Sequence, residues 1–170
     1  MKVYVDFDGV ILDTDRVVLA DFKRSGQLDR REFVRNYDWS ILMDDNLIIK
    51  DSLNNIKNSK LDVSLLSRIG SIDEGFQKVK YLRSRGVLID IVVVPTGIDK
   101  SDMVSSKGNI LIDDKLYNLD KWSESGGISI FFNQNGGCED FYGDINTKYP
   151  VISDLSLLIN GDILKGLLRN

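Results

Sequence analysis

Short apolar runs recur along this chain of 170 residues, and most of them end in a turn or in acidic residues. Runs rich in Val, Ile and Leu predict buried strands at residues 1–5, 87–94, 109–112 and 127–132, with a further short strand at 151–152. Apolar residues at three- and four-residue spacing predict helices from about residue 15 to residue 70. They also predict an amphipathic helix that has its N-cap at Ser71, or at Asp73 nearby, and ends before Gly86. The alternation of strands and helices predicts an α/β fold in which a parallel sheet lies between two helical layers.

Residues capable of chemistry follow three of these strands. They are Asp6 and Asp8, Thr96 and Gly97, and Asp113 and Asp114. Because ligands of parallel sheets bind beyond the carboxyl ends of the strands, we expect these groups at one edge of the sheet. A further acidic pair, Asp44 and Asp45, falls in a helical region and is expected to be solvated. Solvated acids also occur at strand ends, so position alone leaves a structural and a functional interpretation open.

The composition narrows the chemistry that this edge could perform. The chain has no histidine, which excludes a Ser-His-Asp or Cys-His mechanism and a His-ligated zinc site within it. The 22 Lys and Arg against 26 Asp and Glu give a net charge of −4, which argues against a nucleic-acid polymer as partner. No apolar stretch is long enough for a membrane helix, the first residues carry charges where a signal peptide would be apolar, and Cys138 is the only cysteine. These features predict a cytoplasmic protein without a membrane partner.

Four carboxylates that converge on one edge repel one another unless a cation neutralises them. Oxygen ligands without His or Cys favour Mg²⁺ as that cation. An acidic metal site that faces a threonine and a lysine is typical of phosphoryl transfer, because the hydroxyl and backbone N–H groups can hold phosphate oxygens. One aspartate could then attack phosphorus, while another protonates the leaving oxygen and later activates water.

Two segments resemble motifs of the haloacid dehalogenase (HAD) superfamily. Residues 6–14, Asp-Phe-Asp-Gly-Val-Ile-Leu-Asp-Thr, resemble the first motif, and residues 110–114, followed by Lys115 and Asn118, resemble the fourth. Within the superfamily, the order and spacing of residues 110–133 are most similar to the small 5'-nucleotidases, the 5'(3')-deoxyribonucleotidase-like group. The resemblance implies a three-layer Rossmann-like HAD core at residues 1–14 and 70–170. It also implies a small helical cap, residues 15–69, inserted after the first strand.

The resemblance assigns a role to each candidate residue. Asp6 would be the nucleophile that forms an aspartyl-phosphate, and Asp8 would be the general acid and base. Thr96 would bind the substrate phosphate, assisted by the backbone at Gly97. The metal ligands would be Asp6, Asp8 through its backbone carbonyl, Asp113 and Asp114.

The lysine of the third motif is where the sequence departs from the family pattern. Only 17 residues lead from Thr96 to Asp113, so we expect a βα unit to be shortened or missing. Lys100 and Lys107 are both candidates for this lysine. The chain has to return from the active edge to the opposite edge before the strand at residue 109 begins, which places Lys100 nearer the acids and favours it.

These inferences predict a Mg²⁺-dependent phosphomonoesterase that acts through an aspartyl-phosphate on a small phosphorylated substrate, with nucleoside 5'-monophosphates as the expected class. Two alternatives stay open. One is a HAD descendant that binds phosphate ligands without catalysis, and the other is a signalling receiver domain that carries a phosphorylated aspartate. The sequence is compatible with a monomer or a homodimer. The segment after Pro150 could complete the sheet or form a subunit contact.

Overall fold

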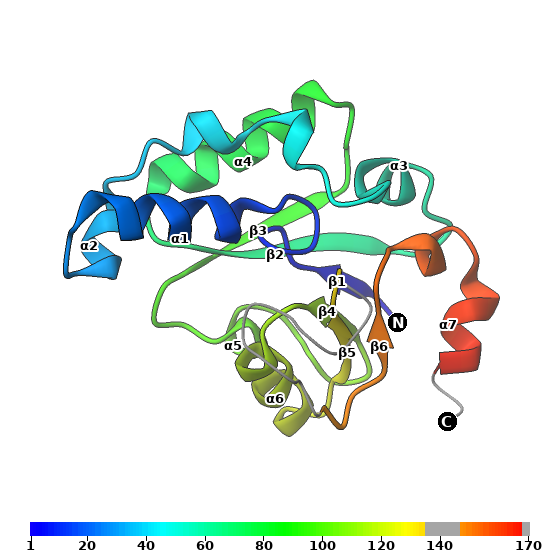
Figure 1. Cartoon of the computed structure of the whole chain (residues 1–170). Coiled ribbons are helices and arrows are strands. Elements are labelled where there is room, and N and C mark those ends of the chain that lie inside the picture. Colours follow the sequence, from blue (N-terminus) through cyan, green and yellow to red (C-terminus); the bar gives the residue numbers. More distant parts are fainter. Residues whose placement is uncertain (135–146, 168–170) are drawn as a thin grey trace.

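The computed structural model describes residues 1–134 and 147–167, and Cys138 lies outside these ranges. Within them the chain forms one six-stranded sheet in which all pairings are parallel, with the strand order β3-β2-β1-β4-β5-β6 (Figure 1). The strands are β1 (Val3–Val5), β2 (Val63–Ile69), β3 (Asp90–Pro95), β4 (Ile110–Asp113), β5 (Ile128–Phe132) and β6 (Val151–Ile152). The predicted α/β fold with a parallel sheet is therefore confirmed.

Helices connect these strands. The α-helices are α1 (Thr14–Ser25), α2 (Arg30–Arg35), α3 (Ser52–Lys57), α4 (Ile72–Ser84), α5 (Lys100–Met103), α6 (Leu116–Glu124) and α7 (Gly161–Leu167). The 3-10 helices are η1 (Trp39–Leu42), η2 (Asp45–Leu47) and η3 (Ser156–Leu158). Helix α4 begins at the predicted N-cap, where the Ser71 hydroxyl accepts a hydrogen bond from the Glu74 N–H.

The two faces of the sheet carry different cores because successive side chains of a strand point to opposite sides. Val3 and Val5 of β1 pack in the larger core with residues of α3, α4 and α7. Tyr4, between them, packs in a second core with Leu119 and Trp122 of α6. Figure 1 shows α4 on one side of the sheet and α5 and α6 on the other. The same alternation decides which helix each side chain faces at the strand ends.

The expectation of helix as far as residue 69 is wrong for Val63–Ile69, which form β2 between β1 and β3. Five consecutive residues from Val63 are buried, and a short apolar run of this kind is compatible with either a buried helix or a buried strand. Pairing with strands on both sides stabilises the strand. No βα unit is missing between the first motif and the fourth, because β2, α4 and β3 supply it.

The region between β1 and β2 has two parts. Val18 of α1 packs with Trp39 and Leu42 of η1 in a small core of its own. Ile49 and Leu53, farther along, belong instead to the larger core of the sheet. Helical structure with a separate core therefore extends from α1 to η1, well short of residue 69.

The segment after Pro150 completes the sheet and its larger core. Strand β6 pairs with β5, and Leu155, Leu157, Leu158 and Leu164 are buried in the core beside α3. Of the two roles considered for this segment, the structure supports burial within the domain. No helix in residues 1–134 or 147–167 combines the length and the apolar character needed to span a bilayer.

Candidate active site

The candidate site lies at the carboxyl ends of β1 and β4, the two central strands. Val5 pairs with Ile112, and the Asp6 N–H donates to the Ile112 carbonyl at 3.0 Å, which brings Asp6 beside Asp113. The strand order reverses between β1 and β4, and parallel sheets bind ligands at such a switch point. The structure therefore brings the two acidic motifs together, as expected from their positions at strand ends.

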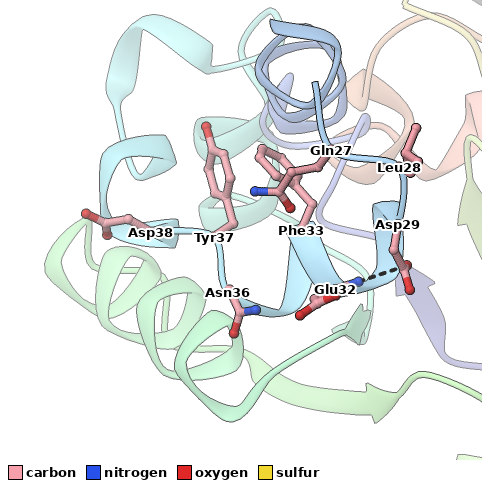
Figure 2. Close-up of a pocket in the computed structure, with 8 residues that line it drawn as sticks. All are labelled: Gln27, Leu28, Asp29, Glu32, Phe33, Asn36, Tyr37 and Asp38. Atoms are coloured by element: carbon pink, nitrogen blue, oxygen red, sulfur yellow. Dashed lines mark hydrogen bonds between the residues drawn. The ribbon is translucent and has the colours of Figure 1, made fainter. Parts of the chain in front are cut away.

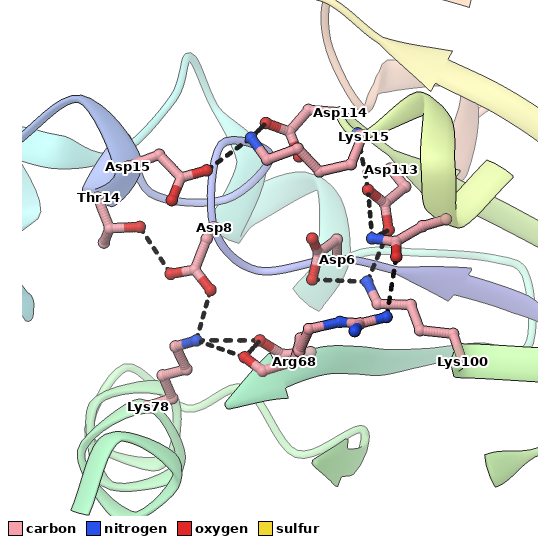
Figure 3. A network of polar contacts seen from close by, with 12 residues as sticks. Asp6, Asp8, Thr14, Asp15, Arg68, Lys78, Lys100, Asp113, Asp114 and Lys115 are labelled. Carbon is pink, nitrogen blue, oxygen red and sulfur yellow. Dashed lines mark hydrogen bonds and ion pairs between the residues drawn. The ribbon is translucent and has the colours of Figure 1, made fainter. Parts of the chain in front are cut away.

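Alternation along the strands turns Asp6 and Asp113 toward α5 and α6, the face that Tyr4 and Leu111 occupy. Lys100, the first residue of α5, reaches them from this side. Its Nζ lies 2.9 Å from Asp6 Oδ1 and 2.6 Å from Asp113 Oδ2 (Figure 3). Burial alone would lower the pKa of Lys100, but the two carboxylates raise it above its ordinary value. The lysine is therefore a buried ammonium ion.

Asp113 is held rigidly at the centre of the site. The Asn118 side-chain amide donates to its two oxygens at 3.1 and 3.0 Å, and the Lys115 backbone N–H donates to Oδ1 at 2.8 Å. Arg68 donates to the Asn118 side-chain oxygen at 3.1 Å, which fixes the orientation of this amide. These contacts leave Asp113 little freedom to rotate.

Asp114 packs against the loop that follows Asp6. A Cβ atom on Gly9 would lie 2.3 Å from Asp114 Oδ2, and Gly9 has a φ of +73°, so this position requires glycine for two reasons. The Lys115 ammonium links Asp114 to Asp15 at the start of α1 (Figure 3). Burial raises the pKa of Asp114 well above its ordinary value, although Lys115 opposes the shift.

Three carboxylates form a group that fits a divalent cation. One oxygen each from Asp6, Asp113 and Asp114 lies within 4.8 Å of the others. Among the described residues, Asp114 Oδ1 is buried and accepts no hydrogen bond, and the buried Asp6 Oδ1 meets only the Lys100 ammonium, as an ion pair at 2.9 Å. Burial also raises the pKa of Asp6. A buried group of three carboxylates, which are hard oxygen ligands, suits Mg²⁺.

Asp8 lies beside this group and is held from two sides. Thr14 donates to Oδ1 at 2.6 Å, and the Lys78 ammonium of α4 contacts Oδ2 (Figure 3). Burial raises the pKa of Asp8, and the charge of Lys78 opposes this shift. Its carboxyl group is therefore positioned by residues that are separate from the three potential metal ligands.

Thr96 and Gly97 lie apart from the acids, so the structure lends no support to the expectation that they bind the substrate phosphate. They follow β3, which β2 separates from β1. Thr96 is exposed, and its hydroxyl donates to the Ile69 carbonyl at 3.0 Å. The expectation arose because β2 was not predicted from the sequence, so that β3 was expected to be the neighbour of β1. Of the two candidate lysines, Lys100 reaches the acids, whereas Lys107 is exposed and packs beside Gly126.

Ser67 is the hydroxyl-bearing residue near the end of β2, the strand that does neighbour β1. It is buried, and its Oγ accepts a hydrogen bond from Lys78 at 3.1 Å. The signal for Ser67 is the apolar run that precedes it. The signal for Lys78 is weaker, because an acid and a lysine four residues apart, here Glu74 and Lys78, are ordinarily found on the exposed face of a helix.

A surface pocket of about 710 Å³ lies away from these acids (Figure 2). It is formed by α2 and by the segments that connect α2 to α1 and to η1. The residues that line it are Gln27, Leu28, Asp29, Glu32, Phe33, Asn36, Tyr37 and Asp38. None of the carboxylates or lysines of the candidate site is among them. We therefore locate the site by its chemistry at the sheet edge and not by the size of a pocket.

Neither a protein-family model nor a curated protein matches the sequence. Solved structures do match. The HAD-hydrolase YfnB from Bacillus subtilis, bound to magnesium, has a TM-score of 0.61 and 15% identity, with 94% of this chain and 98% of that chain covered. The D,D-heptose 1,7-bisphosphate phosphatase from B. bronchiseptica, complexed with magnesium and phosphate, has a TM-score of 0.55 and 14% identity, with 98% and 99% covered.

A third similar structure is beta-phosphoglucomutase from Clostridium difficile. It has a TM-score of 0.59 and 13% identity, with 99% of this chain and 97% of that chain covered. Identities of this size show a shared fold, and the likeness extends over nearly the whole length of each chain. The protein therefore has the α/β fold of HAD-superfamily hydrolases and phosphatases.

Proposed function

We propose that the protein is a Mg²⁺-dependent phosphomonoesterase that acts through an aspartyl-phosphate on Asp6. The observation that carries the proposal is the environment of Asp6. This buried carboxylate stands at the switch point of the sheet, beside the Lys100 ammonium, in a group with Asp113 and Asp114 that fits Mg²⁺. A lysine alone would neutralise a carboxylate with a purely structural role, and two further acids beside it would only add repulsion.

In the proposed first step, an oxygen of Asp6 attacks phosphorus, and the bond between phosphorus and the leaving oxygen breaks. Asp8 gives its proton to that oxygen as the alcohol leaves. In the second step, Asp8 takes a proton from water as the water attacks the phosphorus of the aspartyl-phosphate. This releases inorganic phosphate and restores the Asp6 carboxylate and the protonated Asp8.

The charges around the site suit this reaction. Lys100 would hold a phosphate oxygen while it remains paired with Asp113. We assign the phosphate-binding hydroxyl to Ser67 in place of Thr96, because Ser67 is on the strand next to β1. Held by Asp6, Asp113, Asp114 and the Asp8 carbonyl, Mg²⁺ would screen the phosphate from the carboxylates and stabilise the charge of the transition state.

For the substrate we propose nucleoside 5'-monophosphates, on the resemblance of residues 110–133 to the small 5'-nucleotidases. Helices α1, α2 and η1, which share a small core of their own, would form the cap that selects the leaving group. Trp39 of η1 lies over Lys78 with its ring centre 5.0 Å from Nζ, so this cap touches the site. Sugar phosphates should be tested as substrates too, because two of the similar structures are a heptose bisphosphate phosphatase and a phosphoglucomutase.

The strand order argues against the receiver alternative. Receiver domains use the order 2-1-3-4-5, whereas the order here begins 3-2-1-4-5. The HAD descendant without catalysis stays an alternative. It predicts phosphate binding without turnover.

The test is phosphate release from nucleoside monophosphates and sugar phosphates, with Mg²⁺ and with EDTA. Asp6→Asn is the inactive variant, and Asp102→Asn, which changes an exposed acid of α5, is the matched control. We expect Mg²⁺-dependent release that Asp6→Asn loses and Asp102→Asn keeps. Borohydride reduction during turnover, followed by mass spectrometry, should find homoserine at position 6. Absence of release from every substrate would overturn the proposal.

A further inference from the structure

Lys78 is a fully buried lysine that lies beside the candidate site and contacts Asp8, not the three carboxylates that could bind a metal (Figure 3). Its ammonium contacts Asp8 Oδ2 and lies 2.6 Å from Glu74 Oε1. It also donates to Ser67 Oγ at 3.1 Å and to the Arg68 carbonyl at 3.2 Å. A lysine has three N–H donors, and here four oxygen acceptors surround them.

The residues around Lys78 come from four separate parts of the chain. Asp8 belongs to the loop after β1, Ser67 to the end of β2, and Glu74 to α4 itself. The rings of Phe7 and Trp39 flank the ammonium, with their centres 5.3 and 5.0 Å from Nζ. Glu74 is anchored in turn, because its Oε2 accepts a hydrogen bond from the Gly70 N–H at 2.7 Å. The ammonium thus has a fixed position relative to the sheet.

This arrangement holds the Asp8 carboxyl group in one orientation. Thr14 binds Oδ1 and Lys78 binds Oδ2, so rotation about the last side-chain bond would break two contacts at once. Burying a charged lysine costs free energy, and an apolar side chain could fill the same space in a core without that cost. The Lys78 ammonium lies between the Asp8 and Glu74 carboxylates, and these contacts explain why a charged residue occupies this position.

We propose that Lys78 is a positioning residue, which holds Asp8 where it can transfer a proton to the leaving oxygen. This inference rests on the proposed function. It predicts a dependence on the leaving group. When an alkyl phosphate reacts, the bond between phosphorus and oxygen breaks as the Asp8 proton moves to that oxygen. When acetyl phosphate reacts, acetate leaves without a proton, so a misplaced Asp8 matters little.

The experiment compares kcat/KM for an alkyl monophosphate that the wild type hydrolyses with kcat/KM for acetyl phosphate. This ratio reports the steps up to phosphorylation of Asp6, and so it excludes the later hydrolysis in which Asp8 serves both substrates alike. For Lys78→Met we expect a fall of about 10- to 100-fold on the alkyl ester, because general acid catalysis contributes about 10²–10⁴-fold and Asp8 is misplaced but present. On acetyl phosphate we expect a fall of less than about threefold.

Lys80→Met is the matched control, since Lys80 is exposed on the same helix, and it should leave both values unchanged. Lys78→Met leaves two carboxylates buried without their cation, so Thr14→Val provides a second variant that removes the other Asp8 contact without burying a charge. It should show the same selective loss.

Equal losses on the two substrates in Thr14→Val and in a folded Lys78→Met, or no loss in either, would overturn the positioning role and leave the proposed function standing. A wild-type protein that hydrolyses neither substrate would overturn both.

Discussion

Gly9→Ala tests whether the close approach of the Asp114 carboxylate to the loop after Asp6 is required for the metal site. Alanine at φ +73° costs about 1–2 kcal/mol, because its Cβ crowds the carbonyl oxygen in left-handed backbone. The new Cβ would also lie 2.3 Å from Asp114 Oδ2. Ordinary contacts are about 3.5 Å, so the carboxylate must move by roughly 1 Å. A displaced ligand should weaken Mg²⁺ binding by about 10- to 100-fold.

Gly26→Ala separates these two effects. Gly26 ends α1 with a φ of +68°, and nothing lies within 4 Å of a Cβ built on it. Both variants should lose about 1–2 kcal/mol of unfolding free energy in EDTA, measured by urea denaturation, which corresponds to about 2–8 °C in melting temperature for a chain of this size. Only Gly9→Ala should lose Mg²⁺ affinity in isothermal titration calorimetry. If Gly9→Ala binds Mg²⁺ as tightly as Gly26→Ala does, the close approach of Asp114 is not important for the metal site.

Three further predictions concern the lysine, the hydroxyl and the metal. Lys100→Met should lower the unfolding free energy in EDTA by about 3–5 kcal/mol, because it leaves Asp113 beside another buried acid without a cation, and an unchanged urea midpoint would contradict the ion pairs described here. Ser67→Ala should raise KM by about 10-fold or more, because it removes a hydrogen bond to a charged phosphate, whereas Thr96→Ala should leave KM unchanged. The opposite result in steady-state kinetics would favour Thr96 as the phosphate ligand. Mg²⁺ at 100 times its Kd should stabilise the wild type by about 2.7 kcal/mol in thermal melts, and Asp114→Asn should abolish most of this gain; a full gain in the variant would place the cation elsewhere.

Much of the fold follows from local sequence signals. The apolar run before Asp113 predicted β4, and Ser71 marked the start of α4 at the residue where the structure caps it. Apolar periodicity and capping residues act within a few neighbouring residues, so they can be recognised without knowing the rest of the molecule. The two acidic motifs were recognised for the same reason, since each directly follows a buried strand.

The error at β2 shows where local signals fail. The run from Val63 to Ile69 mixes apolar residues with two serines and an arginine, and its length suits a helix segment or a strand. Its pairing with β1 and β3 made it a strand, and this pairing joins residues about 60 and 25 positions apart. The same strand separates β3 from β1, and so the expectation for Thr96 depended on the same error in secondary structure.

The sequence by itself determined that acids follow two strands of a parallel α/β fold and that a hard divalent cation suits them. Only the tertiary structure decided which side chains complete the site. Lys78 is buried because Asp8 and Glu74 neutralise it, and Lys100 because it pairs with Asp6 and Asp113. A lysine in a sequence is expected on the surface, since burying its charge is costly. The carboxylates that offset this cost come from other strands and helices, and only the folded chain brings them together.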